Sequence, residues 1–260
     1  MKRVIKKLTC CAFVFAACVS TPLFADDAAV AAGATDEKPW SVDMSVALVS
    51  DYMFRGQDLY DGSAIQPYVG GSYDTGYGKL GAFGWMHISA DGSTNVQDFT
   101  ELDLGINYEV DFKPLTFGVG NLWYTYPNDN DGIKDTAEVF FSVALDDSEL
   151  NDFYTLSPKF TFYNDYKEID YEYYELTLSH EYSGGSFGDD ATLTPYVTFG
   201  FASNGEKVYA ENGLEQVTEG LSLALPLGEM TVTPNLNYTH GIDDLARDQF
   251  WFGVTLGYSL

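Results

Sequence analysis

The C-terminal stretch, residues 249–260, alternates between large apolar side chains and small or polar ones. Period-two alternation over this length predicts a strand with one apolar face and one hydrophilic face. A chain that ends on such a strand leaves an edge of unpaired backbone groups unless another strand covers it. We therefore predict that this stretch pairs with the first strand, near residues 40–50, and that the sheet closes on itself.

The same alternation recurs along the chain in segments of about ten residues separated by turn residues, which is typical of a closed, antiparallel, up-and-down transmembrane β-barrel. An even number of strands returns both chain ends to one side of the membrane. Connections after even-numbered segments are mostly short, and those after odd-numbered segments are longer and more acidic, as expected of periplasmic turns and outer loops. The twelve predicted segments are residues 40–50, 64–73, 79–90, 100–110, 115–126, 136–145, 154–163, 171–182, 192–202, 216–225, 230–239 and 249–260.

The N-terminal region has the features of an export signal. A positive start, an apolar core and a cleavage site after Ala25 predict that residues 1–25 are a signal peptide. Its core is too short to span a membrane as a helix. Residues 26–39 are low in complexity and predict a flexible periplasmic leader, which leaves residues 40–260 for the barrel. All three cysteines lie in the signal, so no disulfide is expected after cleavage.

The mature chain is strongly acidic. Removing the four cations of the signal leaves 9 Lys and Arg against 39 Asp and Glu, so the formal charge falls from −26 to −30. This charge excludes a nucleic-acid partner, which needs a basic surface. It is consistent either with a solvated acidic surface or with loops and a lumen that attract cations. After the signal there is no run of 18 apolar residues that could form a transmembrane helix.

Alternation alone also fits a soluble β-sandwich, but two features favour the membrane barrel. The hydrophilic set is made of Gly, Ser, Thr, Asn and carboxylates, which suits a wet lumen better than a lysine-rich soluble exterior. Aromatic residues stand near both ends of the apolar sets, as the interfacial girdles of a barrel require. The predicted girdle residues are Trp40, Tyr73, Tyr108, Tyr126, Phe153, Tyr182, Tyr238, Phe250 and Tyr258.

One motif carries a resemblance to a known family. Residues 50–56 read Ser-Asp-Tyr-Met-Phe-Arg-Gly and are followed by Gln66-Pro67. This string resembles the entry motif of the TorF-type porins, a proteobacterial family of exported proteins with little established function. Residues 101–103 and 124–127 also resemble the middle section of that family, so the resemblance spans most of the mature chain. It implies an outer-membrane barrel with a channel role.

The candidate functional residues follow from strand parity. Carboxylates gather on the predicted lumen face, where they need water or partners, because an unpaired charge in a dry core is very costly. Acidic rings in pores favour cations; the alternative is a lumen filled by hydrogen-bonded side chains, and both remain open. Arg55 is either a fixed cation at the channel mouth or part of a salt bridge that fixes the first outer loop. The pore-lining candidates are Arg55, Glu101, Asp103, Asn107, Glu109, Glu138, Lys159 and Glu175.

An enzyme is the weaker class. Parity places neither His87 nor His180 beside a nucleophile and an acid, and no phosphate loop, dinucleotide fingerprint or zinc signature occurs. His240 lies near Asp243 in an acidic loop that could hold a metal, although a solvated loop is the stronger interpretation. Glu219 falls on the apolar face without an explanation. No catalytic residue, cofactor or metal is therefore predicted.

The sequence predicts a passive, mildly cation-preferring diffusion channel for small solutes in the bacterial outer membrane. The alternative is a filled structural or surface-interaction barrel without conductance, and a barrel hydrolase is a third, weaker possibility. The expected partners are outer-membrane lipid and lipopolysaccharide, small solutes and the barrel-assembly machinery. No oligomeric state is predicted.

Overall fold

The computed structural model describes residues 38–90, 100–127, 134–148, 150, 155–184, 188, 190–205 and 208–260. The predicted signal peptide and most of the predicted leader lie outside these ranges. The described residues form strands, turns and irregular connections without a helix. Accordingly, none of them belongs to a helix that is long and apolar enough to cross a membrane.

Twelve long strands and one short strand form one antiparallel sheet, and two further short strands form a separate hairpin. The short strands are β2 (Tyr52–Phe54), β3 (Gln57–Tyr60) and β11 (Tyr182–Ser183). The long strands are β1 (Trp40–Val49), β4 (Ala64–Asp74), β5 (Lys79–Ser89), β6 (Thr100–Phe112), β7 (Leu115–Thr125), β8 (Thr136–Leu145), β9 (Lys159–Asp165), β10 (Glu172–Ser179), β12 (Thr192–Ser203), β13 (Gly213–Leu227), β14 (Met230–Gly241) and β15 (Gln249–Ser259).

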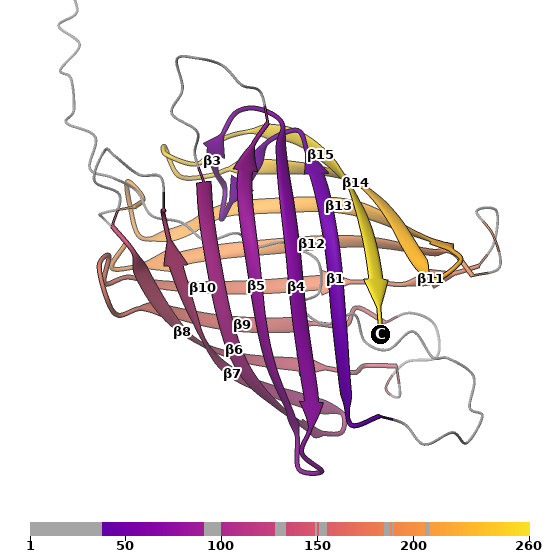
Figure 1. The fold of residues 1–260 in the computed structure, drawn as a ribbon. Helices are drawn as coiled ribbons and strands as arrows, with labels where there is room; N and C mark the ends of the chain where they lie inside the picture. The colour runs from indigo at the N-terminus through magenta and orange to yellow at the C-terminus, as the bar shows by residue number, and fades with distance from the viewer. Residues whose placement is uncertain are drawn as a thin grey trace, which may run out of the picture.

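The sheet closes into a barrel (Figure 1). Each long strand pairs with the long strands that precede and follow it in the chain. β10 pairs directly with β12, although the short β11 separates them in sequence, and β1 pairs with β15. The seam between the first and last strands runs from Asp43 opposite Ser259 to Val49 opposite Gly253. The predicted closure and the predicted fold class are therefore confirmed.

Most predicted strand boundaries agree with the structure to within three residues, and β8 matches its prediction at both ends. The seventh segment is the clearest error, because its strand begins at Lys159 rather than at residue 154. Ser157 has a left-handed φ of 38° and Pro158 has no N–H to donate, so the regular ladder ends here, and only the carbonyl oxygens of Leu156 and Pro158 still accept hydrogen bonds, from Ser179 and Leu145. The eighth segment is also shorter than predicted: β10 stops at Ser179, and Tyr182 pairs separately with β12.

The two faces of the sheet separate by residue type. The outward positions carry exposed apolar side chains such as Val46, Leu104 and Leu256, as expected of a surface that contacts lipid. Most of the predicted girdle aromatics that the structure describes also point outward, whereas Phe153 lies outside the described residues. Tyr126 is an error: it is buried and donates a hydrogen bond to Glu101 inside the barrel. It lies one residue beyond the end of β7 and continues the inward set of Leu122 and Tyr124, so it faces the lumen and not the interface.

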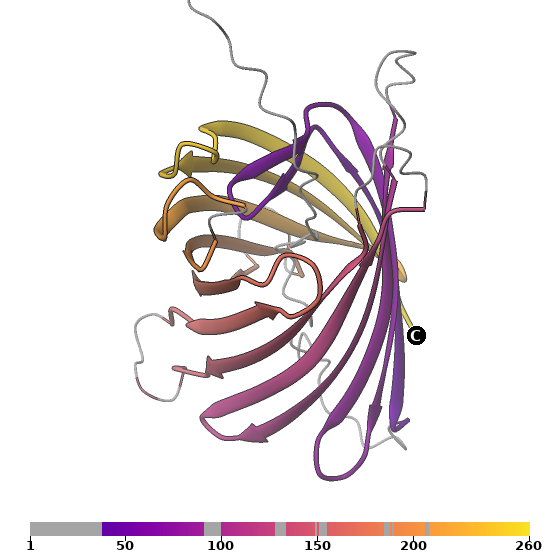
Figure 2. The same cartoon turned by 90° about the vertical axis from the view of Figure 1, so that its left-hand side faces the viewer.

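The connection between β1 and β4 is more ordered than a surface loop. Within it, β2 and β3 form an antiparallel hairpin with Tyr52 opposite Tyr60 and Phe54 opposite Gln57. Figure 2 shows this hairpin, in indigo, reaching from the β1–β4 side across one opening of the ring. We call this segment, residues 51–61, the plug. It lies at the end of the barrel opposite to the C-terminus (Figure 1).

The plug divides the lumen into two parts. At its end of the barrel, inward side chains such as Tyr124, Tyr173 and Thr239 are buried. Toward the other end, inward residues are partly exposed, among them Ser45 on β1 and Glu109 on β6. A twelve-stranded ring is wider than wall side chains alone fill, so the plug fills one half and leaves a water-accessible vestibule in the other.

The assignment of the outer face to lipid leads to a prediction about two neighbouring positions of β15. Val254 is outward and exposed, whereas Thr255 faces the lumen between Ala47 and Thr233. We expect Val254→Lys to lower the free energy of unfolding in lipid vesicles by about 2–4 kcal/mol, because it places a charge near the bilayer midplane. Thr255→Lys is the matched control and should cost less than about 1 kcal/mol, since its charge reaches water. Equal losses for the two variants would contradict a membrane-spanning barrel.

Candidate functional site

The candidate site is the plugged half of the lumen, and its centre is the tip of the β2–β3 hairpin. Arg55 and Gly56 form a two-residue turn with positive φ values of 47° and 84°, as in the type I′ turns that close tight hairpins. Gly56 is also confined by the wall: a Cβ atom here would lie 2.6 Å from Cβ of Gln216. Its carbonyl oxygen accepts a hydrogen bond from the backbone N–H of Arg247 at 2.9 Å. The position of the hairpin tip is therefore fixed by steric contact with the wall and by a backbone hydrogen bond.

Arg55 forms a buried ion pair with the barrel wall. Its Nη1 and Nη2 atoms donate to Oε1 and Oε2 of Glu138 on β8 at 2.8 and 2.9 Å. Tyr124 donates to the same carboxylate at 2.9 Å, and the hydroxyl oxygen of Tyr171 accepts a bond from Arg55. The guanidinium and carboxylate side chains are 1% and 3% exposed. This two-bond geometry is the strongest form of the Arg–carboxylate contact, and it ties the plug to the wall.

Aromatic rings surround the guanidinium group. Its central carbon lies 4.4 Å from the ring centres of Tyr163 and Tyr173 and 4.6 Å from that of Phe54. Such contacts stabilise a cation that has lost its water. Tyr209 stacks on Tyr173 at 6.4 Å and donates to the Arg55 carbonyl oxygen at 3.0 Å. Burial alone would lower the pKa of Arg55, but the charge and hydrogen bonds of Glu138, together with Tyr171 and Tyr124, outweigh this effect and hold the pKa above its usual value, so the cation is permanent.

A second polar cluster holds the base of the plug. Tyr52 donates to Oε2 of Glu101 at 2.9 Å, and Tyr126 donates to Oε1 of the same carboxylate at 3.0 Å. His87 stacks on Tyr52 with 4.5 Å between ring centres and contacts Gln66. Glu101 and His87 are fully buried. Hydrogen bonds therefore satisfy a carboxylate that would otherwise be costly to enclose.

The predicted site residues lie in three places. Glu101, Asp103, Asn107 and Glu138 are buried on the lumen face of the wall. Arg55 lies inside the lumen rather than at a mouth, and its salt bridge joins it to Glu138 instead of to the loop carboxylates beside it. The partly exposed residues of the vestibule wall are Glu109, Lys159 and Glu175. The role of this set in lining a pore remains a prediction.

The aromatic lining of the plugged half was missed. Tyr52, Tyr124, Tyr171, Tyr173 and Tyr209 all contact Arg55, Glu138, Glu101 or one another. The sequence does contain a signal for the hairpin, because an Arg-Gly pair separates two short segments that each end in an aromatic residue. Glycine in a two-residue loop is typical of a hairpin turn. That signal predicts the hairpin but not its position inside the barrel.

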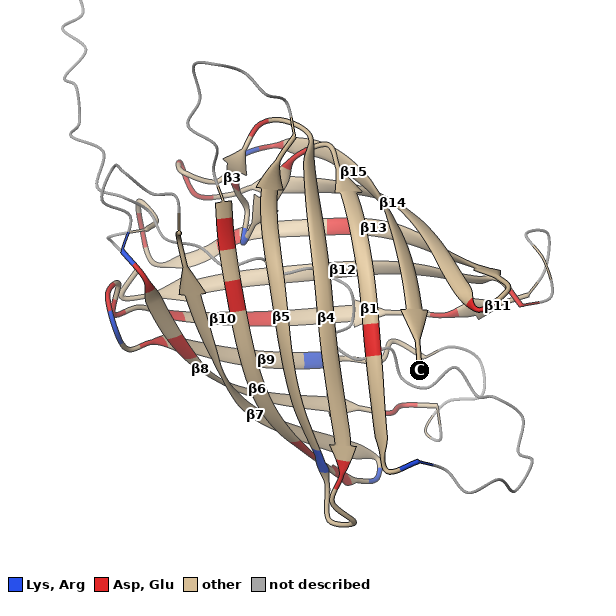
Figure 3. Ribbon diagram, viewed as in Figure 1, with Lys and Arg blue, Asp and Glu red and all other residues tan. Residues whose placement is uncertain are grey.

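The histidines do not form a shared site. His87 is in the plugged lumen, and His180 contacts Thr155 at the opposite end of the barrel. His240 pairs with Glu219 at 2.9 Å on the outside of the wall, which explains the carboxylate on the apolar face. Within the described ranges, no three His, Cys, Asp or Glu residues are already arranged to hold a metal ion. Figure 3 shows that carboxylates, in red, clearly outnumber cationic residues on the walls and rims.

The ion pair leads to a prediction about stability. Arg55→Ala should lower the free energy of unfolding by about 3–5 kcal/mol, because it leaves the Glu138 carboxylate buried without its cation. Replacing both residues with Met should recover most of this loss, since no uncompensated charge remains. The control is Lys134→Ala, which removes an exposed ion pair with Glu168 and should cost less than about 1 kcal/mol. Denaturant unfolding in detergent measures all three, and equal losses for Arg55→Ala and Lys134→Ala would contradict the assignment.

Solved barrels share this fold at low sequence identity. LpxR from Salmonella typhimurium is 11% identical, with a TM-score of 0.53 over 84% of this chain and 99% of that one. The KdgM porin, in a complex with disordered oligogalacturonate, is 10% identical, with a TM-score of 0.52 over 85% of this chain and 99% of that one. Among curated proteins, none matches the sequence significantly. A family model described as "Bacterial protein of unknown function (Gcw_chp)" matches residues 32–258, and the chain therefore belongs to the Gcw_chp family.

Proposed function

We propose that this protein is an outer-membrane, porin-like channel for small cationic or neutral solutes, and that the plug closes it at rest. The observation that carries the proposal is the division of the lumen. A polar, water-accessible vestibule extends from the end of the barrel that carries the C-terminus to the plug. The plug itself is a single short hairpin. Displacement of one segment would therefore connect the two ends of the barrel.

The charges in the vestibule support a preference for cations. Asp43, Glu109 and Glu175 face the lumen and are partly exposed, whereas Lys159 is the cation predicted to face it there. An excess of carboxylates along a pore attracts cations and repels anions. Neutral solutes would pass according to size, because serine, threonine and asparagine side chains supply the remaining polar surface.

One comparison supports the same proposal, because the KdgM barrel, which shares the fold, is a porin. The resemblance of residues 50–56 to the TorF-type porins stays an expectation from the sequence, since the family model that matches is described as one of unknown function. A location in the bacterial outer membrane follows from this proposal, with lipid and lipopolysaccharide around the barrel and the assembly machinery as a transient partner. Passive diffusion requires no catalytic residue and no cofactor.

A filled structural barrel without conductance is the second candidate. The specific observation that favours it is the buried pair of Arg55 and Glu138, with aromatic rings packed around it. The two candidates differ in one measurable respect. If the protein is a plugged channel, removal of the plug must produce a pore, whereas a filled structural barrel stays closed without it.

Single-channel recordings in planar bilayers test this difference. The wild-type protein should be closed for most of the recording. Replacing residues 52–60 with a flexible Gly-Ser linker should give stable conductance steps, because it removes the segment that fills the lumen. Gly56→Ala should give frequent transient openings, since a Cβ atom at this position would collide with Gln216. Lys134→Ala, at the same rim, should behave like the wild type. Silent bilayers with the plug removed would reject the channel and support the filled barrel.

A matched pair of variants tests selectivity in the background without the plug. Lys159 and Glu175 lie on the paired strands β9 and β10. Glu175→Gln should shift the reversal potential in a salt gradient toward lower cation preference, and Lys159→Gln should shift it toward higher cation preference, because each removes one charge from the vestibule. Shifts of the same sign, or none, would contradict electrostatic selection along this wall.

A further inference from the structure

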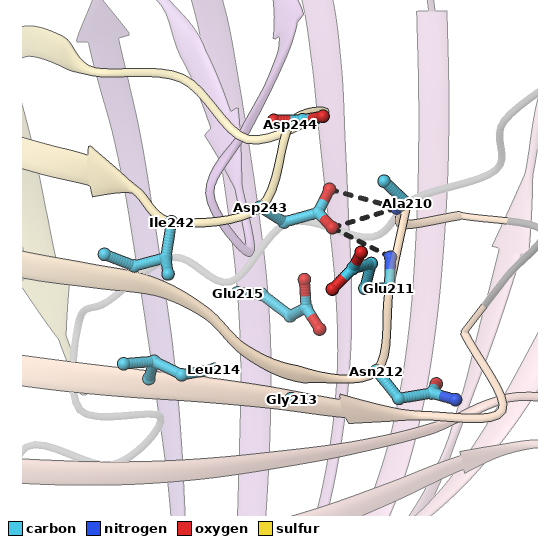
Figure 4. A pocket seen from close by; sticks show the side chains of 9 residues that line it. All are labelled: Ala210, Glu211, Asn212, Gly213, Leu214, Glu215, Ile242, Asp243 and Asp244. Atoms are coloured by element: carbon cyan, nitrogen blue, oxygen red, sulfur yellow. Dashed lines mark hydrogen bonds between the residues drawn. The ribbon is translucent and has the colours of Figure 1, made fainter.

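An acidic pocket lies at the rim of the plugged end, between two connections that also touch the plug. One connection, between β12 and β13, takes part through residues 208–212, and the other is residues 242–248 between β14 and β15. The pocket has a volume of about 250 Å3. Its lining residues, drawn in Figure 4, are Ala210, Glu211, Asn212, Gly213, Leu214, Glu215, Ile242, Asp243 and Asp244.

Asp243 joins the two connections. Its carboxylate oxygens accept hydrogen bonds from the backbone N–H groups of Ala210, at 3.0 and 3.1 Å, and of Glu211, at 3.0 Å. The N–H of Leu245 donates to the same side chain at 2.8 Å. The carbonyl oxygen of Glu215 accepts from the N–H groups of Ile242 and Asp243. The backbone around the pocket is therefore fixed by its own contacts.

The carboxylate of Glu215 is not fully hydrogen-bonded in this arrangement. Glu215 is only 1% exposed, and its Oε2 atom has no hydrogen-bond partner among the described residues. Figure 4 shows its carboxylate directed toward those of Asp243 and Glu211, and Asp243 and Glu211 both repel it electrostatically. A buried carboxylate oxygen without a partner, close to two further negative charges, is costly. A cation in the pocket would remove this cost.

We propose that the pocket binds one hydrated divalent cation, held between Glu215 and Asp243, with the charge of Glu211 adding to the attraction. Oxygen ligands from carboxylates suit hard cations such as Ca2+ and Mg2+. The carboxylates do not already form a three-residue ligand set, so two of them bind the cation and water supplies the remaining ligands, as is usual for Mg2+ and common for Ca2+.

The bound cation also stabilises the closed state of the plug, a consequence that rests on the proposed function. The same two connections hold the hairpin: Tyr209 donates to the Arg55 carbonyl oxygen at 3.0 Å, and Gln57 donates to the Val208 carbonyl oxygen at 2.8 Å. From the other connection, the Arg247 N–H donates to the Gly56 carbonyl oxygen. A cation between the connections limits their separation and therefore keeps both sets of contacts in place.

Calorimetric titration of the full-length mature protein in detergent with CaCl2, and separately with MgCl2, tests the site. The wild type should bind one ion of at least one of these metals per barrel. Glu215→Gln should weaken binding roughly 10-fold or more, since affinity follows the charge of the ligands. Glu211→Gln changes an exposed side chain and should weaken binding without affecting the fold. Asp190→Asn removes a carboxylate at the other end of the barrel and should leave binding unchanged. The absence of one-to-one binding of either metal, or equal effects of Glu215→Gln and Asp190→Asn, overturns the site.

Recordings in phosphatidylcholine bilayers test the link to the plug. For the wild type, removing the bound metal with a chelator should increase the open fraction several-fold. Glu215→Gln should show this higher open fraction both with the metal and with the chelator. Binding without any effect on opening overturns the link but not the cation site. Bilayers that stay silent even when residues 52–60 are removed reject the channel itself, whereas the titration still decides the site.

Discussion

Closure of the sheet is the constraint on which the rest of the structure depends. In lipid there is no water to satisfy a free backbone N–H or C=O group, so an open strand edge cannot exist in a membrane. The pairing of β1 with β15 removes the last open edge. Once the ring is closed, alternation assigns every strand residue to lipid or to the lumen. The carboxylates of β6 and β8 are enclosed for this reason, and the interior must then provide water or partners for them.

The two halves of the lumen meet this requirement differently. In the vestibule, Glu109 and Glu175 remain partly exposed and keep contact with water. In the plugged half, Glu138 and Glu101 have no such contact, and the plug supplies Arg55 to one and the Tyr52 hydroxyl to the other. The hairpin and these wall carboxylates are therefore mutually dependent. Without the plug, the carboxylates would lie in an open lumen, and without the carboxylates, the plug would bury an unpaired cation.

This dependence explains what the sequence could predict. Strand positions, closure and the inward parity of Glu101, Asp103 and Glu138 follow from a local period of two, which any single strand reveals. The partner of Arg55 does not follow from this local pattern. Glu138 is 83 residues away, and the two side chains come together only because the hairpin folds into the ring. The strand start at Lys159 was misplaced because alternation continues through Ser157 and Pro158, where φ and the missing N–H end the ladder. Tyr126 was misassigned because an aromatic residue at a strand end suits both an interfacial girdle and a packed lumen.

The ion pair selects the closed arrangement but contributes little net free energy to holding it closed. When the plug leaves the lumen, Arg55 and Glu138 both regain water, and this hydration offsets most of the attraction lost between them. The larger cost of opening comes from the apolar side chains, at about 1.5–3 kcal/mol for a fully buried residue of the size of Phe54. The contacts from Tyr209 and Arg247 add to this cost, and the connections that supply them form the rim, where a ligand can bind. Control of opening is therefore expected at the rim connections, while the buried pair determines where the hairpin returns.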